Sequence, residues 1–199
     1  VKNFKIITSW KDVTLEKWIK LIKYKKLAKS KEVEETIAAL SDIPKKLIKQ
    51  LQIKDVSVIM NALSDMQTNK NSSLKKIIEI DGKRYGFHPN LDNITLGEWA
   101  DLENFMKNNI QENMPECMAI LYRPIVEETE SGIYTIESYD GNIAIRAEQM
   151  KRMSAEQVQL ALVFFYNLGK KLLQTLPLFL MQKLKEMKTQ SQQNLLQKN

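Results

Sequence analysis

The chain has 199 residues, 43% of them apolar, a single cysteine and a formal net charge of +6. This apolar content can form a folded core, one cysteine excludes an internal disulfide, and the longest apolar run, residues 160–166, is far shorter than the roughly 20 residues of a membrane-spanning helix. Residues 1–31 carry ten basic and two acidic residues, whereas residues 90–140 carry two and eleven. This acidic middle region argues against a protein that only binds nucleic acid. The opposite charge blocks fit either contacts with a partner protein or between copies, or helix faces that are simply solvated.

The N-terminal part of the chain is predicted to be helical. A short strand is expected around residues 4–7, and apolar residues at helical spacing then predict helices through residues 12–66. The polar stretch MQTNKNSS at 66–73 is the best candidate for a linker. We therefore predict a basic helical half over residues 1–66.

A near-repeat opens two of the predicted helices. VTLEKW at 13–18 and ITLGEW at 94–99 place Thr, Leu and Trp at the same spacing. Asp12 or Thr14 can cap the first helix, and Thr95 with Glu98 forms a capping box for the second. The repeat predicts two loosely related halves in which Trp18 and Trp99 anchor helices near their starts.

The second predicted half covers residues 67–176. The Asp81-Gly82 pair between two short apolar runs indicates a β-hairpin, and residues 132–141 alternate like a strand. Residues 116–124 fit a helix or a strand, and residues 143–152 favour a helix. The fold class expected is α+β, predominantly α-helical with one or two short β-hairpins.

A strongly apolar helix is expected after a second capping box at Ser154 and Gln157. It is apolar almost all round, which is typical of a helix in a core or an oligomer interface, and Pro177 is expected to kink or end it. Residues 177–199 are expected to form a polar C-terminal helical tail. The expected core or interface residues are Phe164, Phe165, Leu168, Leu172, Leu173, Leu178 and Phe179.

No reactive constellation is recognisable in the sequence. His88 is the only histidine, and a Cys117–His88 pair would lack the third group that orients such sites. We predict a buried thiol, a loop imidazole and, at Arg123, an internal salt bridge. No catalytic residue, metal or cofactor is expected.

Nucleic-acid binding is the alternative function that the sequence leaves open. The lysine-rich N-terminal helix could contact phosphates, but it has no arginine for bidentate reading of base edges. The same side chains could instead meet an acidic partner protein. The residues concerned are Lys17, Lys20, Lys23, Lys25 and Lys26.

Several longer stretches resemble a family of small proteins of tailed bacteriophages and prophages of Bacteroidota-type hosts. The strongest are YGFHPNLDNITLGEW and MAILYRPI, accompanied by TSW near the N-terminus, IESYDG and ALVFFYNLG. Genes of this family tend to lie among virion-morphogenesis genes. The resemblance spans roughly residues 1–170 and implies no catalytic residues.

The resemblance implies a non-enzymatic virion-morphogenesis protein that acts through protein–protein contacts. It would be either a component of the particle, in the tail or head–tail region, or a tail-assembly chaperone. The expected partners are other phage structural proteins and further copies of the chain in an oligomer or ring. We expect it in the host cytoplasm during assembly or in the virion, without a membrane span.

Overall fold

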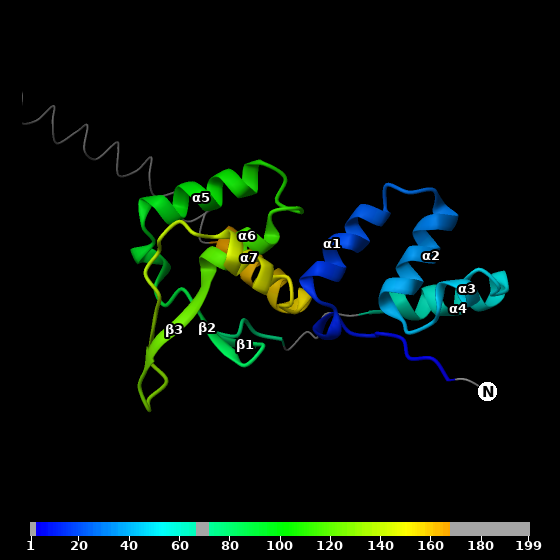
Figure 1. Cartoon of the computed structure of the whole chain (residues 1–199), viewed down its shortest axis with the longest axis horizontal. Coiled ribbons are helices and arrows are strands. Elements are labelled where there is room, and N and C mark those ends of the chain that lie inside the picture. The colour runs from blue at the N-terminus through cyan, green and yellow to red at the C-terminus, as the bar shows by residue number, and fades with distance from the viewer. Residues whose placement is uncertain (1–2, 67–71, 168–199) are drawn as a thin grey trace, which may run out of the picture. The chain divides into compact units, whose positions relative to one another are not determined.

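The computed structural model describes residues 3–66 and 72–167. Within them the fold is predominantly helical α+β, with one four-stranded antiparallel sheet, which confirms the predicted class (Figure 1). Residues 1–160 form one compact unit. The helices and strands are the 3₁₀ helices η1 (Trp10–Asp12) and η2 (Leu91–Asn93), α1 (Leu15–Tyr24), α2 (Lys29–Leu40), α3 (Lys45–Ile48), α4 (Ile53–Ser64), α5 (Leu96–Lys107), α6 (Met114–Leu121), α7 (Ala144–Met150), β1 (Ile77–Ile80), β2 (Lys83–Phe87), β3 (Tyr122–Glu128) and β4 (Tyr134–Ile136).

The helices of residues 12–66 appear as predicted, with two local differences. The expected N-terminal strand is only an isolated bridge between Ile6 and Ser41, because the chain there meets the end of α2 and no neighbouring strand. The lysine-rich helix ends at Tyr24 rather than continuing, so Lys25 and Lys26 lie in the turn before α2. α1 packs on α2, and α2 on α3 and α4.

The near-repeat produces the same helix start twice. Thr14 accepts a hydrogen bond from Lys17 N–H at the start of α1, and Thr95 accepts one from Glu98 N–H at the start of α5. The Glu98 carboxylate in turn accepts a hydrogen bond from Thr95 N–H at 2.7 Å, which completes the predicted capping box. Leu96, the first residue of α5, is 83% exposed.

The predicted hairpin forms at Asp81-Gly82. Both residues have positive φ, as a two-residue turn of the mirror-image type requires. β1 and β2 then pair, and the sheet continues through β3 to β4 in the order β1-β2-β3-β4. The ambiguous apolar segment is both helix and strand, because α6 runs directly into β3.

Residues 13–16 and 151–155 join the helical part to the rest of the compact unit. Leu15 N–H donates to Met153 O at 2.7 Å, and Ala155 N–H donates to Val13 O at 2.7 Å. Val13 and Ala155 are fully buried and belong to one apolar cluster. The other buried members come from α2, α3, α4 and adjoining loops: Ile37, Leu40, Ile43, Ile48, Leu63 and Met66.

The second predicted capping box is only half present. Gln157 N–H donates to the Ser154 hydroxyl at 3.3 Å, so Ser154 does cap the helix at 155–167. The Gln157 side chain, however, accepts from Lys75 N–H and donates to Ser73 O. Its amide is therefore used to hold the chain that leads into β1.

Candidate protein-binding site

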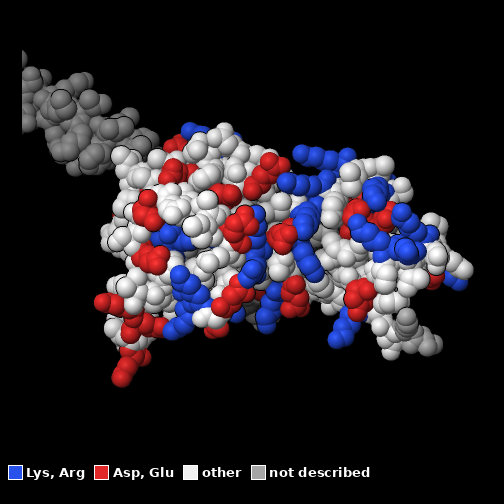
Figure 2. All heavy atoms as spheres, in the orientation of Figure 1, with Lys and Arg blue, Asp and Glu red and all other residues white. Residues whose placement is uncertain are grey.

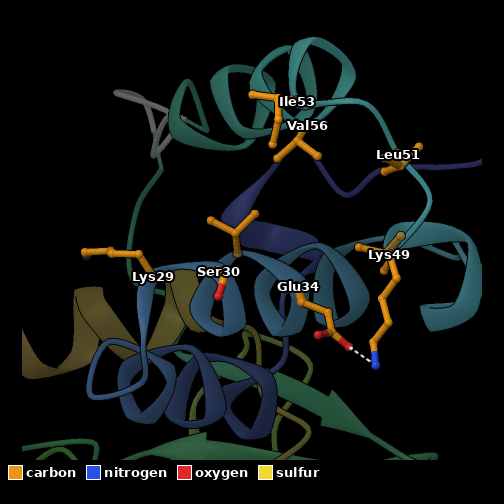
Figure 3. Close-up of a pocket in the computed structure, with 9 residues that line it drawn as sticks. Lys29, Ser30, Glu34, Lys49, Leu51, Ile53 and Val56 are labelled. Carbon is orange, nitrogen blue, oxygen red and sulfur yellow. Dashed lines mark ion pairs between the residues drawn. The ribbon is translucent and has the colours of Figure 1, made fainter.

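A groove of about 500 Å³ lies between α2, α3 and α4. Ile53 and Val56 point from α4 toward α2 across it, and Lys29, Ser30 and the ion-paired Glu34 and Lys49 border it (Figure 3). Most of the wall is aliphatic. The apolar lining residues are Val33, Ile48, Leu51, Ile53 and Val56.

Ile48 is buried and Val33, Leu51 and Val56 are half-buried, but Ile53 stays accessible, and the local sequence explains why. Pro44 caps α3, which ends after one turn at Ile48, and the chain then runs through Leu51 into α4. Ile53 is the first residue of α4, so the preceding turn does not cover it and its side chain is 80% exposed. Aliphatic side chains gathered in a concave surface are typical of a site that binds an apolar partner segment.

The acidic side chains beside the groove are already paired. Glu34 lies 3.3 Å from Lys31 Nζ and 3.7 Å from Lys49 Nζ, and Glu35 lies 2.7 Å from Lys45 Nζ. Residues 1–66 carry fourteen lysines and no arginine against eight acidic residues. The region around the groove is therefore basic, and it favours a partner segment that carries acidic residues beside its apolar ones.

A second feature is a buried polar cluster between α5 and β3. Arg123 Nη2 lies 2.7 Å from Glu98 Oε1, and the two residues are 4% and 1% exposed. This confirms the internal salt bridge predicted for Arg123. His88 Nε2 lies 3.6 Å from the same oxygen, and the Tyr139 ring lies 5.8 Å from the guanidinium carbon.

The protonation states in this cluster follow from burial and charge. Burial lowers the pKa of His88, outweighing the opposing effect of Glu98. Burial raises the pKa of Glu98, but hydrogen bonds from Thr95 and the charge of Arg123 outweigh it, so the net direction is downward. The cluster therefore holds a carboxylate, a guanidinium and a neutral imidazole. Its Glu98–Arg123 ion pair joins α5 to β3.

Neither residue of the candidate nucleophile pair is set up for catalysis. Cys117 is buried in α6, and burial raises the pKa of its thiol to about 12, which keeps it protonated. His88 is engaged with Glu98. Among the described residues, no group of His, Cys, Asp and Glu side chains could hold a metal ion.

The structure places the predicted interface residues in different settings. Trp18 is half-buried against the apolar cluster of the N-terminal helices, and Trp99 is half-buried on α5. In the helix at 155–167, Phe165 is buried and Phe164 is half-exposed. The predicted residues Leu168, Leu172, Leu173, Leu178 and Phe179 lie outside the described residues.

The five lysines proposed for phosphate contacts do not form one group of unpaired cations. Lys20 lies 2.6 Å from Glu16, and Lys23 lies 3.8 Å from Glu112. Lys17 is half-buried on α1, and Lys25 and Lys26 are exposed beyond its end.

The groove residues were not singled out from the sequence. The sequence feature that could have identified them is local: apolar residues at 51, 53 and 56 surround the first turn of α4. Apolar side chains at a helix start have no preceding helical turn to cover them. Sequence periodicity alone treats such residues as core.

Comparisons of the chain with family models, curated proteins and solved structures find no match. No helix among residues 3–66 and 72–167 is long and apolar enough to cross a membrane.

Proposed function

We propose that this chain is a non-enzymatic virion-morphogenesis protein of a tailed phage that works by binding other proteins. The observation that carries the binding role is the aliphatic groove between α2 and α4. The phage context comes from the sequence resemblance. The proposed occupant of the groove is an amphipathic segment of another phage structural protein.

The form of the groove supports this occupant. Ile53 and Val56 lie three residues apart on one face of α4, and Val33 faces the same groove from α2. A helix laid into a groove of this kind buries apolar residues at i, i+3 and i+4 while its polar face stays in water. The surrounding lysines favour acidic residues on that polar face.

The proposal has two versions. As a particle component the protein would remain in the tail or head–tail region as an oligomer or ring, and as a tail-assembly chaperone it would bind its client in the host cytoplasm and leave. Purified, nuclease-treated virions of the encoding phage and infected-cell lysates should be compared by quantitative mass spectrometry. A fixed copy number per particle supports the first version, and presence in assembly intermediates alone supports the second. Absence from both would contradict the proposal.

Nucleic-acid binding is retained as the alternative because Lys25 and Lys26 are exposed and make no ion pair among the described residues. Affinity for a duplex of random sequence is the discriminating measurement. For a phosphate-binding protein, the logarithm of the binding constant would fall steeply and linearly with the logarithm of the salt concentration. A protein-binding role predicts no measurable binding at physiological salt.

A further inference from the structure

The outer edge of β1 is open and hollowed. β1 ends the sheet on one side, and a groove of about 310 Å³ is lined by all four of its residues together with Lys11, Lys75, residues 152–154 and Gln157. Phe87 N–H donates to Lys76 O, which places the backbone groups of residue 76 on the side of β2. Because successive residues of a strand point their backbone groups to opposite sides, those of Ile77 and Glu79 point away from β2. Within the described residues these outward groups have no backbone partner. An edge of this kind accepts an added strand.

The side chains beside this edge are aliphatic and charged, with three cations (Lys11, Lys75 and Arg152) and one acid, Glu79. Ile77 and Ile78 line the groove and are half-buried. Lys11 and Lys75 also line it, are exposed, and make no ion pair in the part of the chain that the structure describes. Arg152, the third cation, is paired with Asp81. The groove therefore favours an extended segment with apolar and acidic side chains.

The same chain carries such a segment at the other end of its sheet. The β3–β4 hairpin extends beyond β1 and β2 in Figure 1, and acidic side chains gather at its end in Figure 2. Glu127 and Glu130 are exposed and make no ion pair among the described residues. Val126 and Ile133 on the same hairpin are 62% and 69% exposed.

The backbone of β4 is also open on its outer side. Glu137 N–H donates to Pro124 O, and Ile133 O accepts from Thr129 N–H. The backbone N–H and C=O groups of the odd-numbered residues of this strand therefore point toward β3. Tyr134 and Ile136 therefore turn their backbone groups outward. In the described part of the chain no strand pairs with them.

From these two edges we infer that copies of the chain associate head to tail, with the β3–β4 hairpin of one copy lying in the β1 groove of the next. Backbone bonds between β4 and β1 would extend the sheet, Ile133 beside β4 would meet Ile77 and Ile78, and the long side chains of the hairpin glutamates would reach Lys11 and Lys75. Because the two surfaces differ, repetition gives a closed ring or an open filament. The inference rests on the oligomer part of the proposed function and uses residues outside the α2–α4 groove.

Charge reversal tests the pairing through two matched variants of the full chain. One reverses the hairpin (Glu127→Lys with Glu130→Lys), and the other reverses the groove (Lys11→Glu with Lys75→Glu). Light scattering after size exclusion, loaded at about 100 µM to exceed a micromolar dissociation constant, should give a multiple of 23.1 kDa for the wild type. Each variant alone should give the protomer mass, and an equimolar mixture should regain the oligomer because each reversed surface then meets an opposite charge.

Three results would overturn the inference: a monomeric wild type at this concentration, variants that keep the wild-type mass, or a mixture that stays monomeric. A backbone test is independent of charge. Glu79→Pro removes an outward donor that the fold itself does not use, so it should lower the oligomer mass at an unchanged melting temperature, whereas Glu79→Ala should not. Equal masses for these two variants would also contradict strand addition. Ile53→Glu, at the exposed residue of the α2–α4 groove, should leave the oligomer intact, which separates failure here from failure of the proposed function.

Discussion

Glu98 of α5 and Arg123 of β3 form an almost completely buried ion pair, with Nη2 and Oε1 2.7 Å apart. Glu98 also closes the capping box of its helix. Removing the carboxylate charge would leave the guanidinium buried without its counter-charge. We expect Glu98→Gln to lower the free energy of unfolding by about 3 kcal/mol, measured by urea denaturation.

The matched control is Glu103→Gln on the same helix. Glu103 pairs with Lys107 at 2.6 Å, but both side chains are largely in water. That substitution should cost under about 0.5 kcal/mol. Equal effects of the two substitutions would show that burial does not distinguish the pairs.

The pH dependence of stability should report His88 and then Glu98. The folded pKa of His88 lies below its ordinary value of 6.5, so the unfolded chain binds its proton first and stability falls as pH decreases through about 6.5. The folded pKa of Glu98 also lies below its ordinary 4.5, so its contribution is lost on further acidification below that pH. Urea midpoints measured from pH 8 to 4 should fall, and His88→Gln should flatten the part between pH 7 and 5. A wild-type midpoint that rises on acidification over that interval would contradict the assignment.

Gly86 of β2 is expected to tolerate no side chain. A Cβ there would lie 2.7 Å from Cδ2 of Tyr134 and 2.9 Å from Cγ2 of Ile136. The Tyr134 ring cannot easily move, because its hydroxyl donates to Phe87 O at 2.7 Å. Gly86→Ala should therefore destabilise the fold by roughly 1–3 kcal/mol in thermal or urea unfolding.

Gly97→Ala provides the contrast for Gly86. A Cβ at Gly97 meets its nearest neighbour, the Tyr139 ring, at an ordinary 3.7 Å, and the residue is helical. Alanine should stabilise α5 by about 0.5–1 kcal/mol. A stabilising Gly86→Ala would mean that the side chains of Tyr134 and Ile136 do not lie against Gly86 as described.

Cys117 should be almost inert in the folded protein. Its thiol is buried and its pKa is about 12, so at pH 8 the reactive thiolate is scarce and shielded. Reaction with a coloured disulfide reagent should be slow in buffer and complete at once in denaturant. Fast labelling of the native protein would place the thiol at the surface.

Local chemistry explains which parts of the fold the sequence could predict. The Thr95–Glu98 box and the Asp81-Gly82 turn depend on residues three or fewer positions apart, and both form as predicted. Only one of the two hydrogen bonds of the Ser154–Gln157 box forms, because the Gln157 side chain bonds instead to residues 73 and 75, more than 80 positions away. Arg123 was predicted to form a salt bridge, but which acid it pairs with depends on how α5 meets β3.

The candidate binding surfaces were less predictable for the same reason. Ile53 and Leu96 both follow an apolar helical pattern, yet each is the first residue of its helix and lies largely in water. Whether a neighbouring element covers such a residue is a tertiary property. The opposite charges around the open edges of β1 and β4 are visible in the sequence, but their positions at the two ends of one sheet are not.

Site-specific photo-crosslinking from Ile53 in infected cells tests the central claim most directly. The control position is Val58, which is also exposed on α4 but does not line the groove. The account predicts that Ile53, and not Val58, crosslinks to one phage structural protein through an amphipathic segment. It also predicts that Val56→Glu removes most of the adduct, with a melting curve to show that the variant is still folded at the temperature of the experiment, because Val56 also packs against the apolar cluster. Equal crosslinking from both positions, or an adduct that survives Val56→Glu, would contradict it.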